Sequence, residues 1–305
     1  MKKLTLLFVA LVTIVLSACS MESPFLENAK EDTAGGNASF KIGFSISTLN
    51  NPFFVTLSEG AKANAQEQGA EISIVDAQDD ASKQASDVED LIQQGVDMIL
   101  INPVDSAAVG SAVESANAAG IPVITVDRSA ESGEVVSHIA SDNVAGGVLA
   151  GEYLLELVGE GAKVAMLEGT AGSSAARDRG EGFLTAVEGK VDLVSSLTAN
   201  FDRGEGLTVM ENMLQANPEI QAVFAQNDEM ALGALEAIEA SGKDIKVIGF
   251  DATDDAVAKV EEGKLAATVA QKPEEIGKAA IETAVAYLNG ETVEEFVPVD
   301  LELVK

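Results

Sequence analysis

Short, almost continuously apolar runs alternate with amphipathic segments along most of the chain. The amphipathic segments, such as 58–69 and 81–95, have helical spacing. The apolar runs are rich in Val, Ile and Leu and comprise residues 41–47, 71–77, 96–102, 121–127, 163–169, 191–197, 220–226 and 245–251. Strands that are apolar on both faces and are separated by helices predict parallel sheets covered by helices on both sides. The predicted fold class is therefore α/β.

Glycines mark the ends of several predicted helices. A glycine just past the last helical residue can adopt the left-handed backbone that ends a helix. The glycines in this position are Gly69, Gly95, Gly120 and Gly242.

One order of strand, turn and helix occurs twice. "MILINPVDSAAVGSAV" at 98–113 corresponds to "AVFAQNDEMALGALEA" at 222–237, with an offset of about 125 residues. In both copies this strand and the next one end in a polar residue: Asn102, Asp127, Asn227 and Asp251. The repeat predicts two similar lobes, and the carboxyl ends of parallel strands are where open α/β sheets bind ligands. For any single one of these residues, a turn-forming role at a strand end remains the alternative.

The start of the chain predicts export. "MKK" is followed by the 13-residue apolar run "LTLLFVALVTIVL" and then by "LSAC", which ends in Cys19. This pattern is typical of a signal peptide, here 1–18, and is too short for a membrane span. "LSAC" resembles the lipobox of bacterial lipoproteins, which implies that Cys19 carries a lipid anchor to the membrane and that 19–38 form a flexible tether. A plain cleaved signal with a chance cysteine is the alternative.

Composition and charge restrict the partners. Cys19 is the only cysteine of the 305 residues, so neither a disulfide within the chain nor a thiolate metal cluster is expected. The formal net charge of −31 becomes −33 when the signal with Lys2 and Lys3 is removed, because 17 basic residues then face 50 acidic ones. A nucleic acid would be repelled by this charge, and a neutral substrate is favoured over an anionic one.

Arginine, carboxylate, amide and aromatic side chains lie at the predicted strand ends. Arg128 directly follows Asp127, and Arg179 lies in "GTAGSSAARDRGEGF" at 169–183, a turn that matches neither common phosphate-binding motif. Carboxylates beside guanidinium groups and amides suit vicinal hydroxyls, which donate and accept at once. Aromatic rings could cover the C–H face of a sugar, and the candidates are Phe53, Phe54, Phe201 and Phe250. The alternative is that these rings close the core under their turns.

The sequence disfavours an enzyme. The single histidine, His138, excludes a metal site with two or three histidines, and no G-x-S-x-G motif is present. We expect a structural role for His138, and we expect Arg128 to keep Asp127 ionised rather than raise its pKa. No catalytic residue, metal or cofactor is therefore predicted. A sugar-responsive transcription regulator is excluded by the signal peptide and the charge.

Seven segments carry a resemblance over about residues 40–303. They are "STLNNPFFV", "ILINPVDSAAVG", "IPVITVDR", "VVSHIASDN", "SAARDRGEGF", "VFAQNDEMALGAL" and "KLAATVAQ". With them the chain resembles the sugar receptors of ABC importers, the type I periplasmic binding protein family, and within it the ribose receptors. The resemblance implies two lobes that close over a monosaccharide, D-ribose, and deliver it to an ABC permease. The ligand contacts it implies are Asn51, Phe53, Phe54, Asn102, Asp127, Arg128, Ser141, Arg179, Phe201, Asn227, Phe250, Asp251 and Gln271.

The resemblance also implies where the chain divides into lobes, and it leaves alternatives for the ligand and for the role. Crossovers are expected near 141–143, 270–272 and 298–300, which divides the chain into lobes of 40–141 plus 272–299 and of 142–271 plus 300–305. Thr170 stands where ribose receptors carry an apolar residue, so another pentose or a hexose is the alternative ligand. A sugar sensor that feeds a chemoreceptor or a sensor kinase is the alternative role. The protein is expected to act as a monomer.

Overall fold

The computed structural model describes residues 39–305, so the predicted signal peptide, Cys19 and the tether lie outside the described residues. Two six-stranded sheets organise these residues, in agreement with the predicted α/β class. We call each sheet together with the helices packed on it a lobe. Within 39–305, no helix combines the length and the apolar character needed to cross a membrane.

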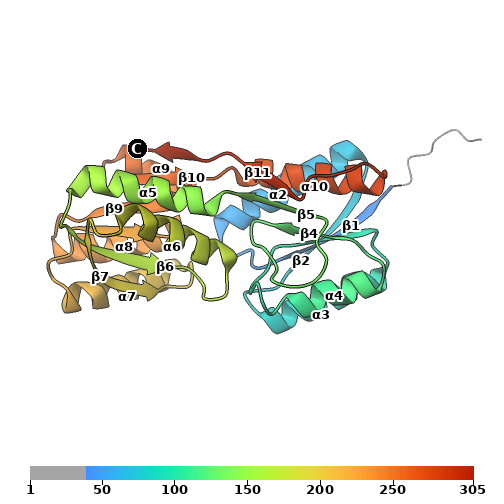
Figure 1. The fold of residues 1–305 in the computed structure, drawn as a ribbon, viewed down its shortest axis with the longest axis horizontal. Helices are drawn as coiled ribbons and strands as arrows, with labels where there is room; N and C mark the ends of the chain where they lie inside the picture. Colours follow the sequence, from blue (N-terminus) through green and yellow to red (C-terminus); the bar gives the residue numbers. More distant parts are fainter. Residues whose placement is uncertain (1–38) are drawn as a thin grey trace, which may run out of the picture. The chain divides into compact units, whose positions relative to one another are not determined.

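The first sheet has the strand order β11-β5-β4-β3-β1-β2, and its strands pair in parallel. Its strands are β1 (Lys41–Ile46), β2 (Glu71–Asp76), β3 (Met98–Ile101), β4 (Val123–Val126), β5 (Ser137–Ser141) and β11 (Phe296–Val299). Its helices are α2 (Pro52–Gln68), α3 (Ala81–Gln94), α4 (Gly110–Ala118) and α10 (Pro273–Leu288). Helices α2 and α10 pack against one another, and α3 and α4 pack against one another (Figure 1).

The second sheet repeats this order as β12-β10-β9-β8-β6-β7, and β12 at its edge is antiparallel to β10. Its strands are β6 (Lys163–Glu168), β7 (Asp192–Thr198), β8 (Ala222–Ala225), β9 (Lys246–Asp251), β10 (Ala267–Ala270) and β12 (Glu302–Val304). Its helices are α5 (Asn143–Val158), α6 (Ser174–Val187), α7 (Arg203–Ala216), α8 (Asp228–Ser241) and α9 (Asp254–Glu261). The internal repeat predicted from the sequence thus corresponds to two sheets of matching topology.

The chain passes between the two sheets three times. It does so between β5 and β6, between β10 and α10, and between β11 and β12. The lobe limits derived from the resemblance stay a prediction.

The apolar runs are strands with both faces buried. In β3, Met98 and Leu100 belong to the core under α2 and α10, whereas Ile99 and Ile101 belong to the core under α3 and α4. Side chains alternate along a strand, so a strand between two helical layers needs apolar residues at every position. The second sheet is built in the same way between α5 and α6 on one face and α7 and α8 on the other.

The predicted helix-ending glycines adopt left-handed backbone. Gly69, Gly95 and Gly242 are the C-caps of α2, α3 and α8, with φ between 68° and 71°. Gly120 has φ 76° but lies one residue past the cap of α4, which is Ala119.

Candidate ligand-binding site

A small cavity lies where strand ends and helix starts of the two lobes meet. It comprises about 230 Å³ of space, part of it continuous with solvent. Its lining residues are Asn51, Phe53, Phe54, Asp127, Arg128, Ala175, Arg179, Phe201, Asn227 and Asp251. All of them except Ala175 were predicted as ligand contacts from the sequence.

The turn before α2 supplies an amide and two rings from the first lobe. Asn51 caps the helix, because its Oδ1 accepts a hydrogen bond from the backbone N–H of Phe53 at 2.9 Å. Phe53 and Phe54 form the first turn of α2 and meet edge to face, with ring centroids 5.2 Å apart. Both rings are also buried in the core under α2 and α10. They therefore serve the core and the cavity wall together.

Asp127 and Arg128 form a buried charged pair at the end of β4. Asp127 has left-handed backbone (φ 63°), and its Oδ2 lies 3.8 Å from Nε of Arg128. Arg128 also donates from a terminal nitrogen to the carbonyl oxygen of Pro103 at 3.1 Å. Its guanidinium lies 5.1 Å from the ring centroid of Phe54 and 5.3 Å from that of Phe201, within the range of cation–π attraction.

Arg179 is the matching cation of the second lobe. It projects from α6 and donates to Oδ1 of Asn143 at 2.8 Å and to the carbonyl oxygen of Gln226 at 2.7 Å. Its guanidinium lies 3.9 Å from the ring centroid of Phe250 and 3.6 Å from Oδ1 of Asp251. These contacts fix the orientation of the guanidinium without using all its donors.

Asp251 ends β9 in a strained conformation. Its φ of 120° lies in a region that favours glycine, and Ala252 after it has φ 55°. The buried Asp228 holds this turn, because its carboxylate accepts hydrogen bonds from the N–H of Thr253 at 2.8 Å and from the hydroxyl of Thr268 at 2.7 Å. The turn thereby directs Asp251 into the cavity, where Nε2 of Gln271 donates to its Oδ1 at 2.9 Å.

Burial shifts the pKa values of the charged groups in the site. Loss of solvation raises the pKa of Asp127, although Arg128 and Arg179 act in the opposite direction. The expectation that Arg128 keeps the pKa of Asp127 from rising is therefore wrong, because desolvation outweighs the ion pair. Desolvation also raises the pKa of Asp251 to about 7, against the attraction of Arg179. Two carboxyl groups of raised pKa thus face two arginines across one cavity.

Four predicted contacts do not line the cavity itself. Asn102 is fully buried, and its amide binds Ser47, the carbonyl oxygen of Val126 and Asp127, so it positions Asp127. Phe250 lies under the guanidinium of Arg179. Ser141 and Gln271 lie at two of the crossovers, and Gln271 lines an adjoining pocket that shares Phe53 and Asp251 with the cavity. Their roles toward a ligand stay predictions.

Thr170 also lies outside the cavity lining. Its hydroxyl donates to the carbonyl oxygen of Asn200 at 3.2 Å, in the turn before Phe201. The hydroxyl is thus engaged by the protein rather than directed at the cavity.

Several buried polar atoms of the predicted contacts have no hydrogen-bond partner. Within the described residues, the buried side-chain atoms in this condition are Asn64 Oδ1, Asp127 Oδ1, Arg128 Nε, Ser137 Oγ, Ser141 Oγ, Ser173 Oγ and Gln271 Oε1. Four of these atoms belong to predicted ligand contacts. Since buried polar groups are normally satisfied, such a concentration calls for an explanation.

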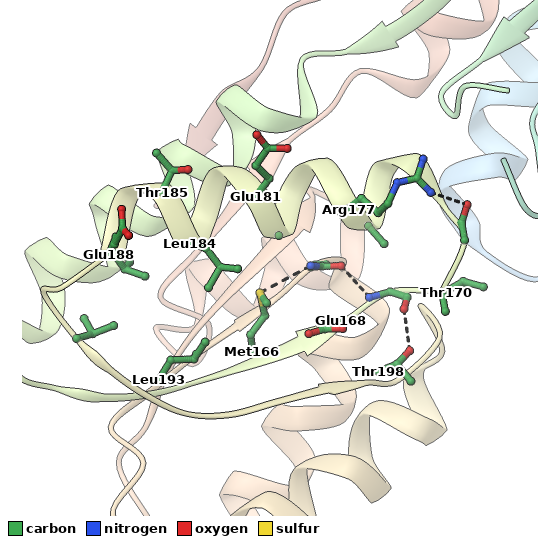
Figure 2. A pocket seen from close by; sticks show the side chains of 18 of the residues that line it. Met166, Glu168, Thr170, Arg177, Glu181, Leu184, Thr185, Glu188, Leu193 and Thr198 are labelled. Atoms are coloured by element: carbon green, nitrogen blue, oxygen red, sulfur yellow. Dashed lines mark hydrogen bonds between the residues drawn. The ribbon is translucent and has the colours of Figure 1, made fainter. Parts of the chain in front are cut away.

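A larger pocket lies elsewhere, between α6 and strands β6 and β7 of the second lobe (Figure 2). None of the predicted contacts lines it. Its inward polar groups are bonded within the protein: Gln226 accepts from the N–H of Gly169 at 2.8 Å, and the hydroxyl of Thr198 donates to the carbonyl oxygen of Gly169 at 2.7 Å (Figure 2). Size alone therefore does not make it the better candidate site.

The geometry offers no catalytic arrangement for His138. Its Nδ1 lies 2.9 Å from the hydroxyl of Thr125, and its ring stacks on Phe296 with centroids 5.7 Å apart. Burial lowers the pKa of His138. Over 39–305, no group of three or more His, Cys, Asp and Glu residues is placed to hold a metal ion.

Two supporting residues and one lining residue could not be identified from the sequence. Asn143 lies at the crossover predicted near 141–143, and its side chain orients Arg179. Asp228 follows Asn227 directly and supports the turn that carries Asp251. An acidic residue that begins a helix predicts only a favourable helix dipole, so this signal was not specific. Ala175 carries no chemical signal at all.

Comparison with known proteins agrees with this architecture. A family model described as "Periplasmic binding protein domain" matches residues 42–292. The chain is 55% identical to the ribose import binding protein of Bacillus subtilis (strain 168), over 99% of both chains. It is 54% identical to the ribose import binding protein of Escherichia coli (strain K12), over 89% of this chain and 93% of that one.

A solved structure extends the comparison to the fold. The solute-binding protein of an ABC transporter from Bacillus halodurans C-125, with bound myo-inositol, superposes with a TM-score of 0.84. It is 37% identical and covers 89% of this chain and 96% of its own. Because the family model spans most of the chain and the two curated relatives are similar over nearly their whole length, the chain belongs to the periplasmic binding protein family.

Proposed function

We propose that the chain is an extracytoplasmic receptor that binds a monosaccharide, D-ribose, between its lobes and delivers it to the permease of an ABC importer. Membership of the binding-protein family supports the class of function and the location outside the cytoplasm. The names of the two curated relatives support ribose as the sugar.

The observation that carries the proposal is the set of buried polar atoms without partners. Asp127 Oδ1 and Gln271 Oε1 are acceptors, Arg128 Nε is a donor, and Ser141 Oγ can act as either. A sugar hydroxyl donates one hydrogen bond and accepts others, so vicinal hydroxyls match such a mixed set. Leaving these atoms unpaired costs about 1–3 kcal/mol each, a penalty that a bound sugar would remove.

The aromatic residues complement the polar set. Phe53, Phe54 and Phe201 line the cavity and offer apolar surface to the C–H faces of a sugar ring. Two of them are also held by cation–π contact with Arg128, which restricts their movement. A ligand that is polar at its edge and apolar on its faces fits this wall.

Ligand binding would be coupled to closure of the lobes. Each lobe carries part of the polar set, so a sugar gains all its contacts only when the lobes are closed, and it shifts the population toward that state. We place the hinges at 141–143, 270–272 and 298–300. The lobes would then comprise 40–141 plus 272–299 and 142–271 plus 300–305, acting as a monomer.

The anchor is part of the same proposal. Lipidation of Cys19 after removal of 1–18 would hold the receptor at the membrane, and the 19–38 tether would let the lobes reach the permease. A tether of this composition and length spans roughly 20–25 Å on average.

Titration calorimetry with a panel of pentoses and hexoses tests the proposal. We expect the parent protein to bind D-ribose more tightly than any other sugar of the panel. Asp127→Asn and Asp251→Asn each replace an acceptor oxygen by a donor, which should weaken binding by one to three decades, or about 2–4 kcal/mol.

Asp87→Asn provides the matched control. It makes the same change of charge on α3, where Asp87 pairs with Lys83 at 2.7 Å and lies outside the cavity lining. Parent-like affinity in both cavity variants would reject the site, and tighter binding of another sugar would reject ribose as the ligand.

A further inference from the structure

The N-terminus of α6 is capped from the other lobe. The backbone N–H groups of a first helical turn have no partner within the helix, and a side chain before the helix usually satisfies one of them. Ser173, at the cap position of α6, makes no such hydrogen bond. Instead the N–H of Ser174 donates to Oγ of Ser106, which belongs to the loop after β3 in the first lobe, at 3.2 Å.

The contact is reciprocal. The N–H of Ser129, in the loop after β4, donates to Oγ of Ser174 at 2.9 Å. The N–H of Ser106 donates to the carbonyl oxygen of Gly172 at 3.0 Å. Each lobe therefore offers a serine hydroxyl to a backbone N–H of the other, and Ser106 and Ser174 are both buried.

The loop of the first lobe is held by a hydrogen bond within that lobe, and the loop of the second lobe approaches it closely. Within the first lobe, the N–H of Glu131 donates to the carbonyl oxygen of Ser106 at 2.8 Å. On the other side, Gly172 has φ 90°, which favours glycine, and a Cβ there would lie 2.0 Å from Oδ2 of Asp105. The two loops are thus joined by a backbone hydrogen bond as well as by the two serine hydroxyls.

Ser106, Ser129 and Ser174 do not line the cavity, although their neighbours Arg128 and Ala175 do. A sugar in the cavity need not touch them. The ion pair between Arg177 and Glu131 at 3.0 Å also joins the lobes, but both side chains are about half exposed, so it contributes little.

We propose that Ser106 and Ser174 form a latch between the lobes that sets the affinity for sugar without contacting it. The inference rests on the proposed function, in which binding requires closure. Contacts that exist only in the closed state stabilise it, and they raise the apparent affinity by the factor by which they favour closure. The latch therefore acts mainly on the release of the sugar, since opening must break it.

Ser106→Ala and Ser174→Ala test the latch, with D-ribose as the probe. Loss of a helix cap of this type corresponds to a rise in Kd of about 3- to 30-fold. We expect that rise by calorimetry, together with a matching increase in the dissociation rate in a chase of radiolabelled ribose. Small-angle scattering of the unliganded variants should give a larger radius of gyration than that of the parent.

Ser173→Ala is the matched control, because Ser173 lies in the same loop and its buried hydroxyl has no partner. It should bind and release ribose as the parent does. Parent-like Kd and dissociation rate in both latch variants would overturn the latch while leaving the receptor function intact. A lower melting temperature with unchanged dissociation from the folded fraction would also overturn it, because it assigns the serines to stability of one lobe.

If the parent protein binds no sugar of the panel, the proposed function is wrong. The scattering comparison alone then tests the latch. A larger radius of gyration for both unliganded variants than for the parent and Ser173→Ala would then support it. Equal radii would overturn it.

Discussion

Asp127 and Asp251 occupy equivalent positions in the two lobes, and both have positive φ. Each carboxylate faces an arginine, Arg128 or Arg179, that is itself buried and in contact with an aromatic ring. Such conformations are costly and are retained where the surrounding structure supports a function. At the scale of single residues, the site is therefore preorganised but electrostatically unfavourable without a ligand.

The raised pKa of Asp251 predicts a pH dependence of stability. Its folded pKa of about 7 lies above the value of about 3.9 in an unfolded chain. The group therefore contributes stability that is fully present below about pH 4 and is lost as the pH rises through 7. Between these values the free energy of unfolding of the unliganded protein should fall by up to about 4 kcal/mol relative to Asp251→Asn.

Urea denaturation of the parent and of Asp251→Asn at pH 4 to 8 measures this difference. Comparison with the variant removes the effect of titrating groups that do not interact with Asp251, while Asp228, whose pKa Asp251 raises, changes with it. Parallel pH profiles of the two proteins would contradict the shift of the pKa of Asp251.

Substitutions of Phe54 should separate the contribution of its flat ring to affinity from that of its apolar area. Phe54→Leu keeps most of the apolar area but loses the flat ring, which is worth about 0.5–1.5 kcal/mol, or about 2- to 12-fold in Kd. Phe54→Ala loses area as well and should bind more weakly still. Because the ring is also part of the core, both variants should melt at a lower temperature than the parent.

The control for Phe54 is Phe44→Leu, a buried ring of β1 in the same core that does not line the cavity. It should lower the melting temperature and leave the Kd for ribose unchanged, measured where all proteins are folded. If Phe54→Leu behaves in the same way as this control, Phe54 is only a core residue.

At the scale of elements, close packing of α5 on α6 positions Arg179. A Cβ at Gly147 of α5 would lie 2.2 Å from the carbonyl oxygen of Arg179 and 2.8 Å from the backbone nitrogen of Phe183. Both are backbone atoms, so α6 as a whole must move to admit a side chain. The two helices lie side by side in Figure 1.

Gly147→Ala should therefore affect stability and binding together. Overpacking of this kind costs about 1–3 kcal/mol of folding stability, and displacement of α6 carries the guanidinium of Arg179 away from Asp251. We expect a lower melting temperature and a higher Kd for ribose by calorimetry. Gly204→Ala in α7, where the only atom within 4 Å is Oδ1 of Asp202 at 3.3 Å, should change neither appreciably.

At the scale of the whole molecule, we expect lipid anchoring and sugar binding to be separable by mutation. Cys19→Ser removes the sulfur that lipidation requires and should release the receptor from the membrane fraction into the soluble one. Ribose affinity should stay that of the parent, because the substitution lies outside the folded lobes. Fractionation of cells without detergent measures the first effect, and a variant that remains in the membrane fraction would contradict the anchor.

Local periodicity was enough to predict eight of the twelve strands found in residues 39–305, but not β5, β10, β11 and β12. Alternation of strand and helix depends on local periodicity, and left-handed caps such as Gly69 depend on local backbone chemistry, so both could be predicted from neighbouring residues. The repeat placed Asp127 and Asp251 at matching strand ends for the same reason. Nine of the thirteen ligand contacts that the resemblance implies line one cavity in the structure.

What each polar or aromatic side chain contacts depends on the tertiary structure. Asn102 and Asn227 have the same position in the repeat, yet the first supports Asp127 and the second caps α8 and lines the cavity. The pKa of Asp127 depends on burial by both lobes, and the cap of α6 comes from Ser106, 68 residues away in the chain. Such contacts are set by how the two sheets pack together, and no local pattern encodes them.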